Sequence, residues 1–526
     1  MLGNVIKEDR IGQGILGGRS KISDGIVVRV GLIGAENKEV EVWSFSMCGS
    51  VRGLQVSGER PESQQETDLL LNPTPKNTSH HHDFNHGPNG YPHKPNKHIC
   101  SIIPPNLLHD ILERNNTSQE TRAAVQKTYD HCSKLLSKRK AHCHQDQVSG
   151  ARQGLAASGA SSSSSTPEDQ ARAQHNIQAT QNIHSLRSAA DTSSTTGAST
   201  SAAAGTPAPD AEDGLFRKIY SSQKTDKLRK KLLYTEGGDV KVLEADVSAK
   251  EVLEYFGKTF EFYKEVFGRD GIDDANLKMI GSLHFDDDPG PPGMDNAFWD
   301  GDEMAFGDGD GEIFGSFTKN IDVIGHELTH GVVQFTANLK YEIQSGALNE
   351  SMADVFGTMI KQYFYPSGKQ LAADADWLIG EGIFLPAITN AKALRSMKAP
   401  GTAYNNPKVG KDRQPSTMAG YAKLPNTDAG DYGGVHINSG IPNHAFYLAS
   451  VALGGYSWEK AGKVWYAALC DEKLKGIDTG TAFKVFADLT VEYAKSLFDA
   501  DTEEKIKKAW VDVGVLEAAK EPKDEV

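Results

Sequence analysis

The chain has 526 residues, with 56 basic and 70 acidic side chains and a formal net charge of −14 at pH 7. This length exceeds what one domain needs, and the acidity argues against nucleic acid as a partner. The five cysteines are too few and too unevenly numbered for a disulfide framework. No apolar run reaches the 18 residues that a membrane-spanning helix requires.

Residues 1–97 are predicted to form an extension that is largely disordered. Residues 25–30 have the pattern of a short strand, but residues 50–97 are polar and rich in Pro, Asn and His. The first 30 residues lack the continuous apolar core of a secretory signal. Two alternatives therefore stay open for the compartment, namely secretion by another route and an intracellular location.

The middle of the chain changes character twice. Residues 98–146 contain an amphipathic helical pattern with Leu107, Leu108, Ile111 and Leu112. Residues 147–214 are dominated by Ser, Ala, Thr and Gly, so they cannot bury a core and are predicted to be a flexible linker. A cleavage site for maturation is expected between residues 197 and 215.

From residue 215 the pattern is globular. Strands are expected at residues 240–243 and 278–285, and a helix with aromatic residues at helical spacing is expected near residues 248–268. Amphipathic patterns predict four further helices at residues 444–453, 458–470, 479–497 and 502–511. Residues 215–355 are assigned to a β-rich lobe with two metal-binding helices, and residues 356–526 to an α-helical lobe.

The most informative motif is His326-Glu327-Leu328-Thr329-His330. Two histidines four residues apart lie on one face of a helix and can bind one zinc ion. Glu350, on a following helix, completes a His-His-Glu set that leaves the fourth zinc position open for water, as in catalytic sites. Glu327 is placed to act as the general base toward that water. Asp354, one turn after Glu350, can accept the outer N–H of a ligand histidine.

A zinc hydrolase also needs groups that stabilise an oxyanion. His436 lies in a Gly-rich stretch and could donate to that oxyanion, with Asp431 orienting its ring. Tyr341, just before the Glu350 helix, is a second candidate donor. Each of these residues taken alone is more often an ordinary polar pair or a packing tyrosine.

Seven segments, three of which contain the residues named above, carry a resemblance to a known family. They are NAFW (296–299), GDGDG (307–311), DVIGHELTHGV (322–332), SGALNESMADVFG (345–357), DWLIGEG (376–382), ALRSMKAPGTAY (393–404) and GGVHINSGIPNHAF (433–446). Through these segments the chain resembles the thermolysin-like neutral zinc metalloproteases. Within that family it is most similar to the protealysin-like branch. The resemblance implies an α+β catalytic domain of two lobes, β-rich and α-helical, with zinc in the cleft between them.

The resemblance also implies roles for individual residues. His326, His330 and Glu350 would bind zinc, and Glu327 would be the general base. Tyr341 and His436 would stabilise the tetrahedral intermediate, and Asp431 would position His436. Asn296, the backbone at Ala297, and Arg395 would hold the substrate main chain. An apolar pocket for the residue after the scissile bond would be walled by Phe314, Val323, Ile379, Ile383 and Leu394. We therefore expect Leu, Ile or Phe on the leaving-group side.

The sequence departs from the family at the double calcium site of thermolysin. Asp322, Asp376 and Glu381 match acidic positions of that site, but Lys361 and Leu378 stand where glutamates would be. Calcium binding is therefore expected to be degraded. Our hypothesis is that the ammonium of Lys361 replaces calcium with an ion-pair cluster.

Residues 98–146 resemble the short pro-segment of protealysin-like precursors. We expect this segment to dock into the active-site cleft as an intramolecular inhibitor. Cys100 either supplies a thiolate to the open zinc position or is an inert apolar residue beside the Pro104-Pro105 pair, and the sequence leaves both alternatives open.

The leading interpretation is a monomeric zinc endopeptidase made as a latent precursor and acting on peptides or proteins. One competitor is a non-enzymatic protein, stabilised by zinc and permanently plugged by its own N-terminal region. Another is an aminopeptidase, which would need a feature that captures a free amine, and no such motif is found.

Overall fold

The structure is a computed structural model that describes residues 17–22, 25–31, 42–46, 100–114, 116–135, 214–287 and 293–518. The cleavage site expected between residues 197 and 215, nearly all of the predicted linker and most of the predicted N-terminal extension lie outside these residues. The chain divides into two compact units, residues 1–88 and 89–526.

The first unit contains a three-stranded antiparallel sheet in the order β1-β2-β3. Its strands are β1 (Gly17–Ile22), β2 (Gly25–Gly31) and β3 (Val42–Ser46). The strand pattern recognised at residues 25–30 thus lies in β2.

The second unit is built on a mixed six-stranded sheet in the order β4-β8-β9-β7-β5-β6. Its strands are β4 (Cys100–Ser101), β5 (Arg217–Thr225), β6 (Lys231–Thr235), β7 (Met279–Phe285), β8 (Ala297–Trp299) and β9 (Met304–Phe306). The edge strand β4 comes from the segment predicted to be a pro-segment. It pairs antiparallel with β8, so that Cys100 lies opposite Trp299.

The long helix α4 (Val247–Phe267) packs against β5 and β7 of this sheet. The side chain of Asp246 caps its N-terminus by accepting from the amide of Ala249, and Gly268 ends it with a left-handed φ of 67°. The helix predicted near residues 248–268 is therefore confirmed. The strand predicted at residues 240–243 is wrong, because Val240–Leu243 forms a short 3-10 helix, η1, capped by Asp239.

Two buried helices cross the centre of the unit, α5 (Ile321–Gln334) and α6 (Ile343–Tyr363). They approach each other closely at two glycines. A Cβ atom on Gly357 would lie 2.5 Å from the Asp322 carbonyl oxygen, and one on Gly325 would lie 3.3 Å from the Gly357 Cα. The predicted lobe boundary between residues 355 and 356 falls inside α6.

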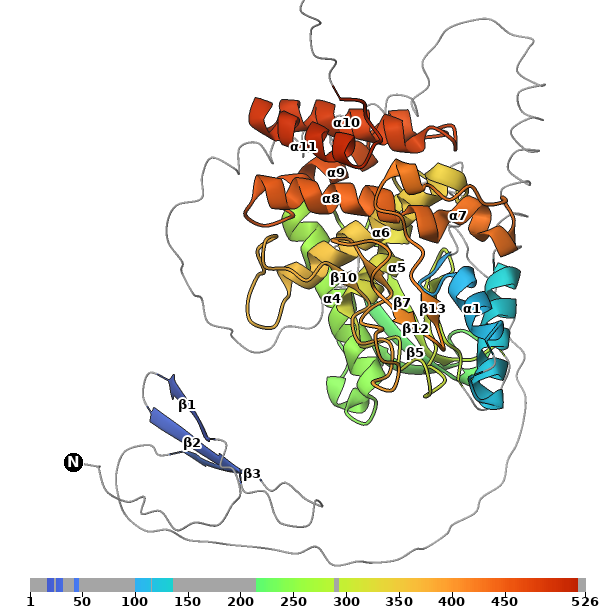
Figure 1. The fold of residues 1–526 in the computed structure, drawn as a ribbon. Helices are drawn as coiled ribbons and strands as arrows, with labels where there is room; N and C mark the ends of the chain where they lie inside the picture. The colour runs from blue at the N-terminus through green and yellow to red at the C-terminus, as the bar shows by residue number, and fades with distance from the viewer. Residues whose placement is uncertain are drawn as a thin grey trace, which may run out of the picture. The chain divides into compact units, whose positions relative to one another are not determined.

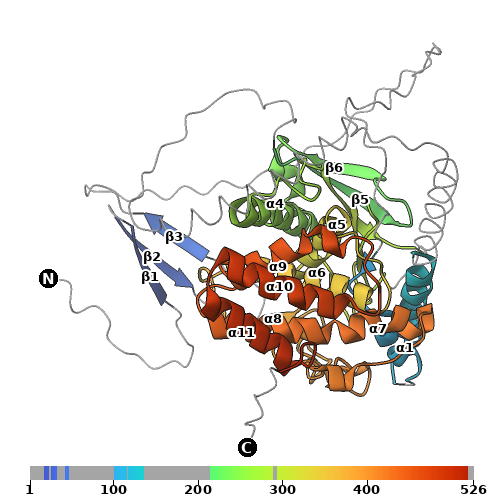
Figure 2. The ribbon, with the colours of Figure 1, turned by 90° about the horizontal axis from the view of Figure 1, so that it is seen from above.

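The C-terminal lobe is helical, and Figures 1 and 2 show its helices gathered on the side of α6 away from the β-sheet. It contains α7 (Asp431–Asn438), α8 (Gly440–Leu453), α9 (Ala461–Leu469), α10 (Ala482–Leu497) and α11 (Ala500–Asp512). The four helices predicted here are all present, within about four residues at each end. None of the described helices has the length and apolarity to cross a membrane.

The N-terminal segment of this unit contributes two helices, α1 (Pro105–Leu112) and a helix at residues 119–135. Pro104 and Pro105 open α1, where a missing N–H costs no hydrogen bond. Leu107, Leu108 and Ile111 are buried in the same hydrophobic core as the rest of the unit. The amphipathic pattern read from the sequence is thus confirmed as an apolar face packed on the rest of the unit.

Candidate active site

The helices α5 and α6 bring His326, His330 and Glu350 together in a fully buried site. The two histidine Nε2 atoms are 3.1 Å apart, and they lie 3.5 and 3.6 Å from the Glu350 carboxylate oxygens. A tetrahedral zinc ion with bonds of about 2.0 to 2.1 Å holds its ligand atoms about 3.3 Å apart. Glu350 Oε2 is buried and accepts no hydrogen bond from a described residue. The three side chains therefore fit one zinc ion.

A second layer of residues fixes both imidazoles. Asp354 Oδ1 lies 2.8 Å from His326 Nδ1, and Asn349 Oδ1 lies 2.9 Å from His330 Nδ1. With Nδ1 donating to these oxygens, each Nε2 is left with a lone pair for a metal. Asn349 was missed as an orienting residue, although its place beside Glu350 on one helix was readable from the sequence.

Glu327 is also completely buried, and its Oε2 accepts from the backbone amide of Trp299 at 3.0 Å. Burial, followed by the negative charge of Glu350, raises the pKa of Glu327 well above its ordinary value. A carboxyl group with a raised pKa is suited to accept and return a proton near neutral pH.

Tyr341, His436 and Asp431 form a chain of polar contacts beside Glu350. The Tyr341 hydroxyl donates to Glu350 Oε1 and lies 3.1 Å from His436 Nε2. Asp431 contacts His436 twice, at 2.6 Å through the ring Nδ1 and at 2.9 Å through the backbone amide. Burial lowers the pKa of His436, but the carboxylates of Glu350 and Asp431 outweigh burial and raise it to about 9.

The backbone before His436 has an unusual conformation that sets this geometry. Residues 431–434 all have positive φ, between 49° and 87°. Two of the four are glycines, which adopt this region without strain. A Cβ on Gly434 would also lie 2.9 Å from Asn438 Nδ2. The Gly-rich stretch therefore turns the chain so that the following helical turn presents His436 to Glu350.

The five residues predicted to wall an apolar pocket are all buried and belong to one hydrophobic cluster. Leu394 and Val323 both flank Gly380, because a Cβ there would lie 3.1 and 3.6 Å from their side chains. The Leu394 amide donates to the carbonyl of Ile379 at 2.9 Å, in the pairing of β10 (Leu378–Ile379) with β11 (Arg395–Ser396). The other two predicted wall residues are Phe314 and Ile383. Phe314 forms an isolated antiparallel β-bridge with Phe384, the residue after Ile383.

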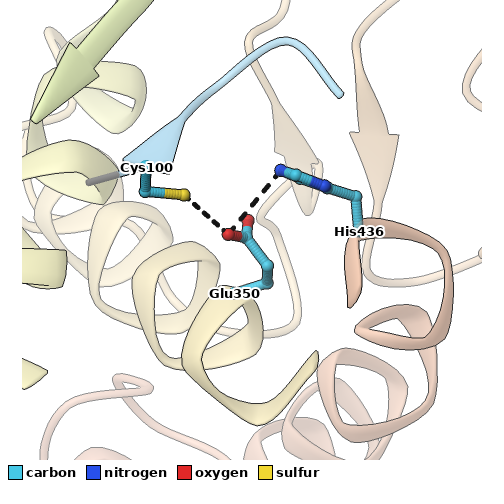
Figure 3. A group of neighbouring side chains, drawn as sticks. All are labelled: Cys100, Glu350 and His436. Atoms are coloured by element: carbon cyan, nitrogen blue, oxygen red, sulfur yellow. Dashed lines mark hydrogen bonds and ion pairs between the residues drawn. The ribbon is translucent and has the colours of Figure 1, made fainter. Parts of the chain in front are cut away.

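Residues 100–103, here called the cleft segment, lie directly against Glu350 and the residues around it. The Cys100 thiol donates to Glu350 Oε1 at 2.9 Å and lies 2.9 Å from the Tyr341 hydroxyl. Figure 3 shows Cys100 from β4 and His436 from α7 reaching the Glu350 carboxylate from opposite sides. Burial is the main reason that the pKa of the Cys100 thiol lies well above its ordinary value, and the charges of Glu350 and Glu327 add to it.

Asn296, Ala297 and Arg395 contact the backbone of this same segment. The Ile102 amide donates to the Ala297 carbonyl at 3.1 Å, and the Ile103 amide donates to Asn296 Oδ1 at 3.1 Å. Arg395 Nη1 donates to the Ile102 carbonyl at 3.3 Å, while its other nitrogens bind Asp354 at 2.8 and 2.9 Å. The residues predicted to hold a substrate main chain thus hold the N-terminal segment.

The helix at residues 119–135 anchors this segment on the β-rich lobe. Lys127 forms an ion pair with the buried Asp286 at 2.5 Å, and Thr121 donates to Glu312 at 2.7 Å. Cys132 accepts from Asn296 Nδ2 at 3.2 Å. The anchor and the cleft segment therefore share Asn296.

Two family models match the chain. The model described as "Thermolysin metallopeptidase, catalytic domain" matches residues 164–334, and the one described as "Thermolysin metallopeptidase, alpha-helical domain" matches residues 337–515. The chain belongs to the thermolysin family. It is thus a zinc-dependent metallopeptidase with the expected two-lobed α+β fold.

Among thermolysin-family relatives, the chain is 44% identical over 303 residues to "Protease PrtS" of Photorhabdus sp. (strain Az29), covering 58% of this chain and 77% of that protein. It is 42% identical over 299 residues to "Extracellular metalloprotease" of Pectobacterium carotovorum subsp. carotovorum, covering 57% of this chain and 81% of that protein. A solved structure titled "Precursor of Protealysin, Metalloproteinase from Serratia proteamaculans" superposes with a TM-score of 0.58 and 36% identity. That match covers 79% of this chain and all of the other.

The acidic residues that were expected to match a double calcium site surround an ammonium group. Lys361 Nζ lies 2.9 Å from Asp376, 3.6 Å from Glu381 and 3.9 Å from Asp322, and it donates to the Leu378 carbonyl at 3.2 Å. Burial lowers the pKa of Lys361, but the carboxylates, Asp322 foremost, outweigh burial and raise it.

Proposed function

We propose that this chain is a latent precursor of a zinc endopeptidase that cleaves before Leu, Ile or Phe, with residues 98–146 as its intramolecular inhibitor. The observation that carries the proposal is the run of residues 100–103 through the cleft, against Glu350, Asn296 and Arg395. The likeness to the protealysin precursor supports a precursor form. One chain supplies every residue of the site, which favours a monomer.

The proposed chemistry assigns one role to each buried polar group. Zinc, when bound, polarises a carbonyl group and lowers the pKa of water toward about 7. Glu327 accepts the proton of the attacking water and returns it to the leaving amine. Tyr341 and His436 donate to the developing oxyanion, and Asp431 holds His436 in the donating orientation. Arg395 and Asn296 hold the main chain on the leaving-group side.

The expected specificity follows from the pocket walls. All five wall residues are apolar and at most 3% exposed in the precursor. A charged side chain would lose its hydration there without gaining a partner. Ile102, whose amide and carbonyl contact Ala297 and Arg395, belongs to the same hydrophobic cluster. This apolar β-branched residue is completely buried beside the groups proposed to hold a substrate main chain.

Latency has two proposed components, occlusion of the cleft and the Cys100 thiol. The sulfur lies among Glu350, Tyr341 and His436, and it shares Glu350 with the two zinc-binding histidines. Thiolate is a good zinc ligand, and in the absence of a cation burial keeps this thiol protonated. We therefore propose that Cys100 takes the zinc position that water needs. A Cys100→Ser precursor as latent as its parent would refute the role of the thiolate and leave occlusion standing.

We further propose that Lys361 replaces the calcium of the thermolysin family. Its ammonium group lies within 4 Å of all three remaining acidic side chains. One positive charge can offset part of their repulsion, although it cannot supply the coordination of a divalent ion.

The test is cleavage of a quenched peptide library by the full-length chain before and after proteolysis of the linker. The same chain carrying Glu327→Gln serves as the control. Activity should grow as the linker is cut, disappear with 1,10-phenanthroline and be absent from the variant. A cleavage profile rich in charged residues after the scissile bond would refute the specificity. A zinc-loaded chain that stays inactive after cutting would instead favour a plugged, non-enzymatic protein.

A further inference from the structure

The N-terminal segment occupies the cleft in the register of a substrate, and we propose that the precursor can cleave it. Ser101–Ile102 lies where a scissile bond would lie, and the Cys100 side chain alone prevents its hydrolysis. A precursor without this thiol would cut its own chain between residues 101 and 102. The inference rests on the proposed endopeptidase function and adds a specific intramolecular substrate to it.

The amide of Ile102 has the surroundings that a leaving nitrogen requires. It donates to the Ala297 carbonyl at 3.1 Å, and it lies close enough to Glu327 to lower the pKa of that carboxyl group slightly against the effect of burial. A general acid must lie within hydrogen-bond reach of the atom that it protonates. Glu327 therefore faces the nitrogen to which it would return a proton if this bond broke.

The carbonyl of Ser101 has the surroundings that a reacting carbonyl requires. Its oxygen lies 3.3 Å from His436 Nε2. Asp431 holds the other ring nitrogen at 2.6 Å and thereby fixes the ring with Nε2 facing the Ser101 oxygen. Preorganised donors at a carbonyl oxygen stabilise the charge that develops there when a nucleophile attacks.

The residues that follow continue the same register. The Ile102 carbonyl accepts from Arg395 at 3.3 Å, and the Ile103 amide donates to Asn296 Oδ1 at 3.1 Å. Ile102 and Ile103 are completely buried. On the other side of the bond, Ser101 pairs with Phe298 in antiparallel β-sheet. Backbone contacts on both sides thus fix which peptide bond lies between Glu327 and His436.

Cys100 is the residue of this segment whose side chain would prevent hydrolysis of the Ser101–Ile102 bond. Its sulfur lies 2.9 Å from both Glu350 Oε1 and the Tyr341 hydroxyl, and so contacts a proposed zinc ligand and a proposed oxyanion donor at once. Without the sulfur, one water molecule can add across the bond. Its hydroxyl joins the Ser101 carbonyl carbon, the C–N bond breaks, and its other hydrogen goes through Glu327 to the Ile102 amine.

The experiment uses the zinc-loaded full-length chain with Cys100→Ala, followed by intact mass and N-terminal sequencing. The expected product begins at Ile102, and its rate of formation does not depend on precursor concentration because the reaction is intramolecular. Adding Glu327→Gln should slow it by about 10²-fold or more. Cys470→Ala removes a thiol outside the site and, like the parent chain, should leave this bond intact.

A second measurement does not depend on cleavage or on the Cys100→Ala variant. In the zinc-loaded Glu327→Gln precursor, the amides of Ile102 and Ile103 should exchange hydrogen roughly 10³-fold more slowly than in an unstructured peptide. Free exchange at Ile102 would overturn the register. An intact Ser101–Ile102 bond in Cys100→Ala would overturn the inference if that chain, once its linker is cut, hydrolyses an added peptide. Failure of both reactions in every chain would instead count against the proposed function.

Discussion

Replacing Lys361 by Met should destabilise the catalytic unit because it leaves the buried Asp322 carboxylate, and two more exposed carboxylates beside it, without their cation. The Asp322 side chain is 2% exposed, whereas those of Asp376 and Glu381 are 31% and 53% exposed. Removing one partner of a buried ion pair costs about 3 to 5 kcal/mol. We take about 3 kcal/mol, because only Asp322 is fully desolvated. At about 2 °C per kcal/mol for a unit of this size, the Tm should fall by about 6 °C.

The assay is thermal unfolding in calcium-depleted buffer with zinc held constant. Lys473→Met is the matched control, because its ion pair with Glu492 is exposed on both sides and should contribute little to stability. Equal losses of Tm in the two variants would refute the reasoning that burial makes Lys361 matter.

The response of Tm to added calcium provides a second test of the role of Lys361. Lys361→Glu restores a fourth carboxylate, so its Tm should be low without calcium and should rise as calcium is added. Saturation at 100 times the dissociation constant corresponds to about 2.7 kcal/mol. The parent chain should not respond. A parent Tm that rises with calcium as the variant's does would show that Lys361 has not replaced the ion.

Three further predictions concern the polar groups of the catalytic unit. Tyr341→Phe should lower kcat by about 10²-fold or more with little change in KM, because it removes one oxyanion donor; an unchanged kcat would exclude that role. Asn349→Ala should weaken zinc affinity by about 10- to 100-fold, measured by competition with a chelator, because it frees the ligand imidazole that it orients; unchanged affinity would contradict this. Hydrogen bonds to Asp246 and then Asp308 raise the pKa of His284 from 6.5 to about 10. Its stabilising contribution should therefore be complete below pH 6.5 and be lost as the pH rises through about 10. The Tm difference between the parent chain and His284→Asn should shrink over that range, and a constant difference would refute the charge pairing.

The sequence was most informative where chemistry depends on fixed spacing along one helix. The four-residue interval between His326 and His330 places both rings on one face of α5 in any helix, so the ligand pair needed no tertiary information. Asn349 was missed because an amide that orients a ligand has no spacing rule of its own. Its partner is defined only when α6 packs on α5.

Short segments were predicted less well because their conformation depends on what lies beside them. The alternating residues 240–243 looked like a strand, yet Val240 and Val242 are 56% and 62% exposed, so this alternation buries neither valine. The Asp239 carboxylate accepts a hydrogen bond from the Lys241 amide and thereby stabilises a 3-10 helix instead. Likewise, docking of residues 98–146 was expected, but the register of Cys100 in the cleft depends on pairing between β4 and β8.

The pairing of β4 with β8 has a consequence for the tendency of this protein to aggregate. In the order β4-β8-β9-β7-β5-β6, removal of β4 would leave β8 as a bare sheet edge. Unpaired edges invite strands of other chains and promote aggregation, and most proteins block them with charges, bulges or covering loops. A peptidase that binds substrates by adding them to an edge strand cannot block that edge permanently. If residues 98–146 are removed during maturation, as proposed, β4 resolves this conflict, since it covers the edge of β8 until the enzyme is released to bind substrates.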